Sequence, residues 1–211
     1  MLLSPQFRRS LGGLLPALAL CAGAGAASLS GPQLVAAIDG GGYVILMRHA
    51  QSPRTPPDAA TADPRNIRRE RQLDETGRAT ARAMGDALRQ LRLPVGKVLS
   101  SPTYRALETA RLARLPKPET FDELGDAGNS MSADLTGKRA AWLRARVAQV
   151  PKAGTDTLII THYPNISEAF PDDARDLSEG EALIFHPDAK GAGALLGRVK
   201  IEDWPRLASG R

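Results

Sequence analysis

Short apolar runs separated by amphipathic or polar stretches predict a domain in which strands and helices alternate. The earliest such run after residue 30, Tyr43–Met47, is apolar throughout and follows three glycines. A continuous apolar run of this length is typical of a strand buried on both faces of a parallel sheet. We expect it to be the first element of the domain. Further strands are expected at Val95–Leu99, Thr157–Thr161, Glu181–His186 and Ala194–Lys200, the last closing the chain.

Apolar residues recur at helical spacing in three other segments. They predict a helix over Glu75–Leu91 with Asp74 as its N-cap. A second helix is expected over residues 101–115, with Ser101 as N-cap and Pro102 in the first helical position, and a third near residues 137–150. Strands that alternate with helices predict a single α/β domain, a three-layer α/β/α sandwich around a mainly parallel sheet.

The N-terminal segment differs from the rest of the chain. Residues 1–27 begin with a short region containing Arg8 and Arg9, continue as an apolar run from Leu11, and end in small residues. This pattern predicts a secretory signal peptide followed by a domain at residues 28–211, and hence a periplasmic or secreted protein. A membrane anchor is the alternative, but two glycines and a proline interrupt the run before the roughly 20 apolar residues that a spanning helix needs. We therefore expect no stable membrane insertion of the mature domain, and the export route stays open.

Composition and charge exclude several classes of function. Cys21 is the only cysteine and lies within the expected signal, so a mature domain would have no disulfide, thiol nucleophile or thiolate metal site. The net charge of +5 includes two signal-peptide arginines, and aromatic residues make up only 4% of the chain. No basic tract interleaved with aromatic residues is present, so nucleic acid is not an expected partner.

Basic residues concentrate instead in a polar, proline-rich segment, Ala50–Gln72, which is too long to be a plain connector. Its arginines outnumber its acids, which favours a small anionic ligand over a polyanion. The arginines are Arg54, Arg65, Arg68, Arg69 and Arg71, and the acids are Asp58, Asp63 and Glu70.

Two of the three histidines follow predicted strands directly. Arg48 and His49 come after the first strand, and His162 comes after the strand at 157–161. Because ligands collect at the carboxyl ends of parallel strands, we expect these side chains to lie at one edge of the sheet. His186, which precedes a proline, is expected to be a surface histidine.

Arg105 lies in the first turn of the second predicted helix. Free backbone N–H groups and the helix dipole favour an anion there, and a guanidinium can grip phosphate oxygens with two donors. The alternative is an exposed helical arginine paired with Glu108 three residues later. These two readings stay open on the local sequence.

Four segments, in order along the chain, share motifs with a known family. Leu46–Ala50 resembles its Arg-His-Gly signature, with Ala50 in place of Gly, and Arg71–Gly77 is similar to its Leu-Thr-x-x-Gly helix start. Ser100–Ala110 closely resembles its Ser-Ser-Pro-x-x-Arg-Ala-x-x-Thr-Ala block, and Thr161–Ile166 its Thr-His-Gly-x-x-Ile segment, with Tyr in place of Gly. The family is the histidine phosphatase superfamily, and the chain resembles its phosphoglycerate mutase-like, small exported bacterial members.

The resemblance implies a phosphate pocket made of Arg48, His49, Arg105 and His162. His49 would accept the phosphoryl group, and Arg71 would be a further phosphate contact. Many members take a general acid from the stretch after the second helix, which implies Glu123 among several carboxylates of residues 119–126. Arginines would supply the positive charge that phosphoryl transfer needs, so no metal or other cofactor is expected.

The expected function is that of an exported phosphomonoesterase, which acts through a phosphohistidine on a small phosphorylated substrate. Lipopolysaccharide-core sugar phosphates are the substrate class associated with the small exported members. Two alternatives remain: a phosphate-binding module whose catalysis has decayed, suggested by the two replaced glycines, and a phosphatase of phosphohistidine proteins. The sequence does not indicate an oligomeric state.

Overall fold

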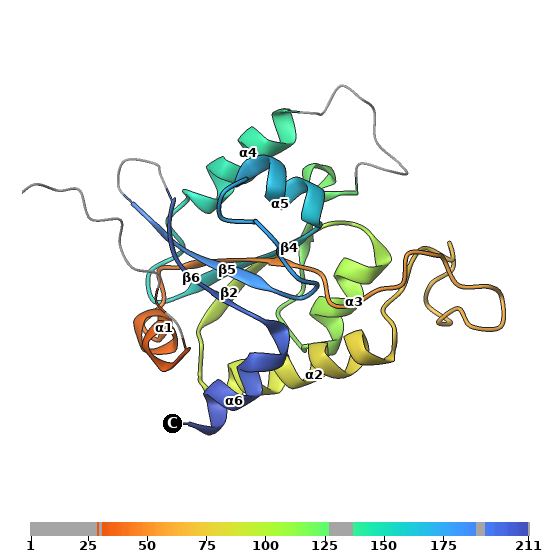
Figure 1. Ribbon diagram of the computed structural model, residues 1–211, viewed down its shortest axis with the longest axis horizontal. Coiled ribbons are helices and arrows are strands. Elements are labelled where there is room, and N and C mark those ends of the chain that lie inside the picture. Colours follow the sequence, from red (N-terminus) through yellow and green to blue (C-terminus); the bar gives the residue numbers. More distant parts are fainter. Residues whose placement is uncertain (1–28, 30, 127–136, 189–192, 211) are drawn as a thin grey trace, which may run out of the picture.

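A mixed β-sheet lies between two layers of helices in the computed structural model of the chain, which describes residues 29, 31–126, 137–188 and 193–210 (Figure 1). The predicted three-layer α/β/α sandwich is thereby confirmed. The signal peptide predicted at residues 1–27 lies outside the described residues. Among the described helices, none combines the length and apolar character needed to cross a membrane.

The sheet has the strand order β3-β2-β4-β1-β5-β6. The first four strands in this order run parallel to one another, and β5 and β6 are antiparallel to their neighbours. The sheet is therefore mixed, with a parallel half that contains both strands preceding the histidines. The strands are β1 (Val44–Arg48), β2 (Val95–Ser100), β3 (Glu119–Thr120), β4 (Asp156–Thr161), β5 (Ala182–Pro187) and β6 (Gly193–Val199).

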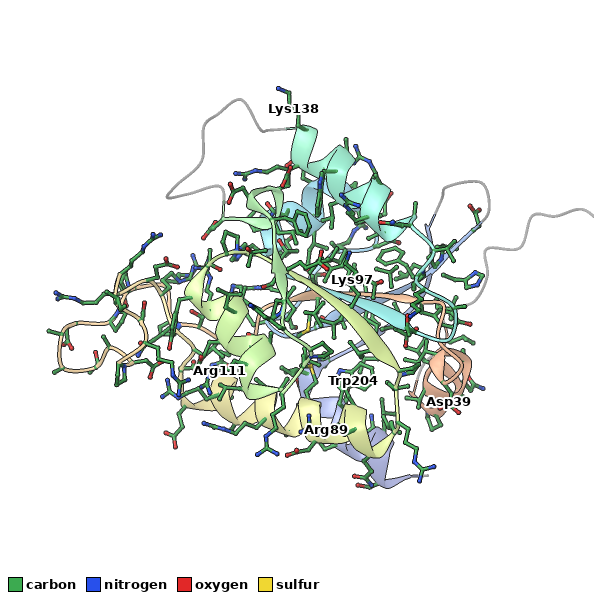
Figure 2. The ribbon with its side chains drawn as sticks, turned by 180° about the vertical axis from the view of Figure 1, so that it is seen from behind. Asp39, Arg89, Lys97, Arg111, Lys138 and Trp204 are labelled. Atoms are coloured by element: carbon green, nitrogen blue, oxygen red, sulfur yellow. The ribbon has the colours of Figure 1, made fainter. Side chains whose placement is uncertain are left out.

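Helices α1, α2, α3 and α6 cover one face of the sheet, and α4 and α5 cover the other (Figure 1). Successive residues of β1 alternate between the two cores: Ile45 and Met47 pack on the first face, Val44 and Leu46 on the second. Trp204 of α6 fills the space between that helix layer and the sheet (Figure 2). The helices are α1 (Gly31–Ile38), α2 (Glu75–Gln90), α3 (Tyr104–Leu112), α4 (Lys138–Val147), α5 (Tyr163–Ala169) and α6 (Trp204–Ser209), with short 3-10 helices η1 (Asp122–Leu124) and η3 (Ile201–Asp203).

Helix α2 has the predicted N-cap, and its first turn packs against the segment that follows His49. The Asp74 carboxylate accepts the backbone N–H of Gly77 at 2.7 Å, which caps the helix. A Cβ at Gly77 would lie only 2.1 Å from the carbonyl oxygen of Gln51. Only glycine therefore allows α2 to pack this closely against the segment that follows His49.

Three predictions about element order and boundaries are wrong. The first described element is α1, not the strand at 43–47, and α6 rather than a strand ends the described chain. Helices α1, α5 and α6 have eight, seven and six residues, too few to show a helical period clearly. Helix α3 begins at Tyr104, with Thr103 as its N-cap residue. The Ser101 hydroxyl accepts the Thr103 N–H and contacts His162 instead of capping the helix.

Candidate active site

The two histidines meet at the carboxyl end of the parallel strands, as predicted. Strands β1 and β4 are adjacent, with Arg48 opposite Thr161 in the register, so the next residue of each strand is a histidine. The backbone N–H of His49 donates to the Thr161 carbonyl at 3.0 Å. The imidazole centroids of His49 and His162 lie 5.2 Å apart, and the two residues are only 3% and 2% exposed.

Hydrogen bonds determine which nitrogen of each imidazole carries the proton. His49 Nδ1 lies 2.7 Å from the Ala50 carbonyl oxygen, which can only accept, so Nδ1 is protonated and Nε2 holds the lone pair. His49 Nε2 accepts a hydrogen bond from Arg105 Nε at 3.1 Å. His162 Nδ1 accepts from Arg105 Nη2 at 3.0 Å, and its Nε2 lies 2.9 Å from the Ser101 hydroxyl. Both imidazoles therefore present a lone pair to the same guanidinium.

Burial and neighbouring positive charge keep both imidazoles neutral. Burial is the main cause that lowers the pKa of His49 to about 3. The hydrogen bond to the Ala50 carbonyl opposes it, and the charges of Arg105, Arg48 and Arg71 add smaller effects in the same direction as burial. Burial and Arg105 also lower the pKa of His162 well below its usual value. At neutral pH the His49 Nε2 lone pair is consequently free of a proton, which is the state that a nucleophile requires.

Arg105 is a buried member of the site rather than an exposed helical arginine. It is 4% exposed, and besides the two imidazoles it contacts Asp126, whose Oδ2 lies 2.5 Å from Nη2. Glu108, the alternative partner suggested by the sequence, pairs with Arg111 instead. The first turn of α3 therefore delivers a guanidinium to the edge of the sheet where the histidines lie.

A threonine in the same helix links this arginine to the backbone after His49. The Thr109 hydroxyl accepts the N–H of Ala50 at 3.1 Å and donates to the carbonyl of Arg105 at 2.8 Å. Thr109 belongs to the eleven-residue block at 100–110 but received no role from the sequence. The hydrogen bonds show that it joins the segment that carries His49 to the helix that carries Arg105.

The carboxylate that contacts Arg105 is Asp126 rather than Glu123, the acid that the family resemblance implies. Glu123 is half-buried in η1, and within the described part of the chain no hydrogen bond or ion pair joins it to the histidines or to Arg105. Asp126, three residues later, holds Arg105 directly. The local sequence offers several acids at similar spacing and does not distinguish them.

Two buried polar side chains hold the turn that carries Asp126. The amide of Asn165 donates to the Gly125 carbonyl at 2.8 Å and to the Thr161 hydroxyl at 2.9 Å. The Thr161 hydroxyl in turn donates to the Leu124 carbonyl at 2.8 Å. The segment around His162 therefore fixes the backbone immediately before Asp126, a function that sequence reasoning missed.

Arg48 does not contact the imidazoles directly. Its guanidinium forms an ion pair with Glu179 at 2.9 Å, donates to the Leu177 carbonyl at 3.2 Å and lies 5.8 Å from the ring centroid of Tyr163. Its charge nevertheless helps to lower the pKa of both histidines. A carboxylate 131 positions later thus holds Arg48 beside the site, and its predicted contact with phosphate oxygens stays a prediction.

Arg71 donates hydrogen bonds to the backbone of the polar segment between β1 and α2, and it also lines a cavity at the site. Its Nε and Nη2 donate to the carbonyls of Pro53 and Ser52, at 2.7 and 3.1 Å. It lines a cavity of about 400 Å³ together with Arg105 and Asp126. Within residues 29, 31–126, 137–188 and 193–210, no cluster of three His, Cys, Asp or Glu side chains could hold a metal ion.

His186 lies apart from this site, as predicted. Strand β5 runs antiparallel to β1, so its end lies at the opposite edge of the sheet. There the exposed His186 ring lies against Tyr43 in a tilted arrangement, with a centroid distance of 5.2 Å. The third histidine therefore provides a natural control for the other two.

Comparison with known families agrees with this geometry. Residues 44–151 match the histidine phosphatase superfamily (branch 1), and the chain belongs to that superfamily. The matched range includes Arg48, His49, Arg71 and Arg105, and it ends before His162. Among curated proteins, none matches the chain significantly.

Solved structures show the same fold at low sequence identity. The protein histidine phosphatase SixA in complex with tungstate is 20% identical, with a TM-score of 0.56 over 76% of this chain and 98% of SixA. A putative phosphohistidine phosphatase SixA from Nakamurella multipartitia is 23% identical, with a TM-score of 0.52 over 74% and 94% of the two chains. A phosphoserine phosphatase from Entamoeba histolytica in complex with 3-phosphoglyceric acid is 16% identical, with a TM-score of 0.52 over 74% and 95%.

Proposed function

We propose that this chain is an exported phosphomonoesterase in which His49 forms a phosphohistidine intermediate. The observation that carries the proposal is the unprotonated Nε2 of a buried, neutral His49, 3.1 Å from Arg105 and next to His162. Family membership and the fold shared with a tungstate-bound phosphatase support the same chemistry, since tungstate is a tetrahedral oxyanion.

In the first step, His49 Nε2 attacks phosphorus in line with the ester oxygen. The P–N bond forms as the P–O ester bond breaks, and the negative charge is spread over the equatorial oxygens. Arg105 then donates to those oxygens instead of to the imidazole nitrogens. A phosphoryl dianion next to His162 also favours a proton on Nδ1, which turns that nitrogen into a second donor. The Ala50 carbonyl keeps Nδ1–H of His49 in place and stabilises the positive imidazole.

Asp126 is proposed to supply the proton to the leaving alcohol. Its carboxyl group contacts Arg105, the residue proposed to hold the phosphate oxygens, so it lies next to the reacting centre. In the second step, the Asp126 carboxylate removes a proton from water as the water attacks the phosphohistidine. Phosphate is released and His49 is regenerated. The Asn165–Thr161 hydrogen bonds would hold the acid in reach during both steps.

We further propose that the natural substrates are sugar phosphates of the lipopolysaccharide core, reached after export through a signal peptide at residues 1–27. The support is the pattern of residues 1–27 and the resemblance to small exported members. N-terminal sequencing of protein recovered from periplasmic extracts tests export, because the proposal requires a mature chain that begins near residue 28. A full-length chain confined to the cytoplasm would refute it.

The intermediate is tested by rapid quench with a ³²P-labelled aryl phosphate. Phosphohistidine survives alkali and is lost in acid, so the wild type should carry a base-stable, acid-labile label. His49→Ala should carry none and should release no phosphate, while His186→Ala serves as the matched control and should behave like the wild type. A labelled, active His49→Ala variant would exclude the proposed nucleophile, and phosphate binding without any turnover would favour a module with decayed catalysis.

A phosphohistidine protein is the second candidate substrate. It is favoured by the similarity to structures described as protein histidine phosphatase SixA and as putative phosphohistidine phosphatases of that name. Initial rates on a phosphohistidine-containing carrier protein, compared with rates on sugar phosphates at equal concentration, separate the two candidates. A higher kcat/KM for the phosphoprotein would replace the sugar-phosphate proposal.

A further inference from the structure

The polar segment between β1 and α2 projects from one edge of the molecule next to α3 (Figure 1). Its second half is a fixed turn centred on Asn66, which is only 3% exposed. The Asn66 side chain accepts the N–H of Glu70 at 2.9 Å and donates to the Glu70 carbonyl at 2.6 Å. These two bonds close a three-residue loop, Ile67 to Arg69, whose side chains are all exposed.

Glu70, which follows Arg68 and Arg69 in the sequence, does not pair with either arginine. Glu70 Oε2 accepts the backbone N–H of Tyr104 at 2.8 Å, so its carboxylate caps the start of α3. Asp63 accepts a hydrogen bond from the Tyr104 hydroxyl at 3.3 Å. Within the described residues, Arg68 and Arg69 have no hydrogen bond or ion pair through their guanidinium groups. Arg69 also has a φ of 49°, a left-handed conformation that non-glycine residues rarely adopt outside constrained sites.

These two free guanidiniums share one cavity with groups of the candidate active site. Its volume is about 400 Å³, and its lining includes Arg68, Arg69, Arg71, Arg105 and Asp126. A volume of this size accommodates a whole small molecule rather than a single tetrahedral ion. A substrate whose reacting phosphate contacts Arg105 has room in this cavity to extend to Arg68 and Arg69.

We propose that Arg68 and Arg69 form a second anion subsite, and that the preferred substrate is a phosphate monoester whose alcohol portion carries another phosphate. This inference rests on the proposed function and names its substrate class. Two unpaired guanidiniums at a fixed turn match phosphate oxygens in charge and donor geometry, whereas a neutral alcohol would leave them without partners. The turn gives the pocket selectivity for a bisphosphorylated ligand.

The test compares two substrates that differ by one phosphate, glucose 6-phosphate and glucose 1,6-bisphosphate, at constant ionic strength. Wild type should show the higher kcat/KM for the bisphosphate. In R68A/R69N, where asparagine tolerates the left-handed backbone, kcat/KM for the bisphosphate should fall at least about tenfold more than for the monophosphate. Arg65→Ala removes the same kind of charge from the same segment but outside this cavity, and should keep the preference.

Equal losses of kcat/KM on both substrates, or the same selective loss in Arg65→Ala, would show that only the overall positive charge of the segment matters. Either result would overturn the subsite. Binding of both ligands to the same variants by calorimetry separates this inference from the proposed function. If neither sugar phosphate is hydrolysed but the bisphosphate binds more tightly through Arg68 and Arg69, the subsite stands and the phosphatase proposal fails. If both are hydrolysed and bind without a preference, the subsite fails alone.

Discussion

Replacing Arg105 separates the contribution of its charge from that of its geometry. The guanidinium donates to His49 and His162 at 3.1 and 3.0 Å and pairs with Asp126. Removing one such preorganised donor from an anion site typically costs about 2–4 kcal/mol of transition-state stabilisation. Arg105→Ala should therefore lower kcat/KM by roughly 30- to 1,000-fold. Arg105→Lys keeps the charge but lacks the planar fork, so it should fall between the alanine variant and the wild type, about tenfold below the latter.

The pH dependence of the same variants provides a second readout. The charge of Arg105 is one of the causes that lower the pKa of His49, after burial. Its loss in Arg105→Ala should raise the pKa of His49, so the acid limb of the kcat/KM profile should move to higher pH. The shift should be smaller in Arg105→Lys, which retains a positive charge.

Initial rates of phosphate release from an aryl phosphate between about pH 2.5 and 8 provide both measurements, with thermal melts over the same range to confirm folding. Arg111→Ala is the matched control, because Arg111 belongs to the same helix but lies on its outer side, paired with Glu108 (Figure 2). An Arg105→Ala variant within fivefold of the wild type would refute the role assigned to this guanidinium. An Arg105→Lys variant with full activity would refute only the requirement for a planar guanidinium.

Four further predictions follow from buried groups. Asn165→Ala should lower kcat more than it raises KM and cost about 1–3 kcal/mol in urea unfolding, since it leaves the Gly125 carbonyl without its donor; unchanged kcat would contradict the positioning role. The pKa of His49 is about 3 in the folded chain and 6.5 for an ordinary histidine, so between these pH values the unfolded chain binds the proton more tightly. The titration of His49 should lower the free energy of unfolding by about 1.4 kcal/mol per pH unit as pH drops from 6.5 toward 3. His49→Gln should reduce the measured slope by that contribution. Burial raises the pKa of Asp156 to about 6, so its contribution to stability is present below its ordinary pKa and lost as pH rises through 6. The stability of Asp156→Asn relative to wild type should therefore increase between pH 4 and 7, and a constant difference would exclude this titration. Gly77→Ala should lower the melting temperature, because its Cβ would clash with the Gln51 carbonyl; an unchanged melt would show that α2 can shift freely.

The main elements of the fold and the meeting of the two histidines could be predicted because both depend on local patterns. A buried apolar run shows where β1 and β4 lie, and parallel pairing places whatever follows them at one edge. The eleven-residue block at 100–110 added Arg105, which local spacing alone could not separate from an exposed arginine paired with Glu108. The same reasoning failed for α1, α5 and α6, whose short length hides the helical period.

The identity of the site carboxylate and the orientation of Arg48 depend on long-range contacts that no local pattern encodes. Asp126 reaches Arg105 because Asn165, 40 positions away from Gly125, holds the preceding backbone. Arg48 turns toward Glu179, which lies 131 positions later and in a connection between elements. Selecting either from sequence would require knowing the tertiary structure in advance.

The hydrogen bonds of Arg105 in the free site also affect how fast inorganic phosphate is released. Because its donors already have internal acceptors in the two imidazoles and Asp126, an oxyanion that enters must exchange these bonds rather than satisfy idle donors. The net gain from binding inorganic phosphate is thereby reduced, whereas the transition state places its three charged equatorial oxygens in line with His49 and still gains from the guanidinium. Such an arrangement favours fast release and weak inhibition by orthophosphate.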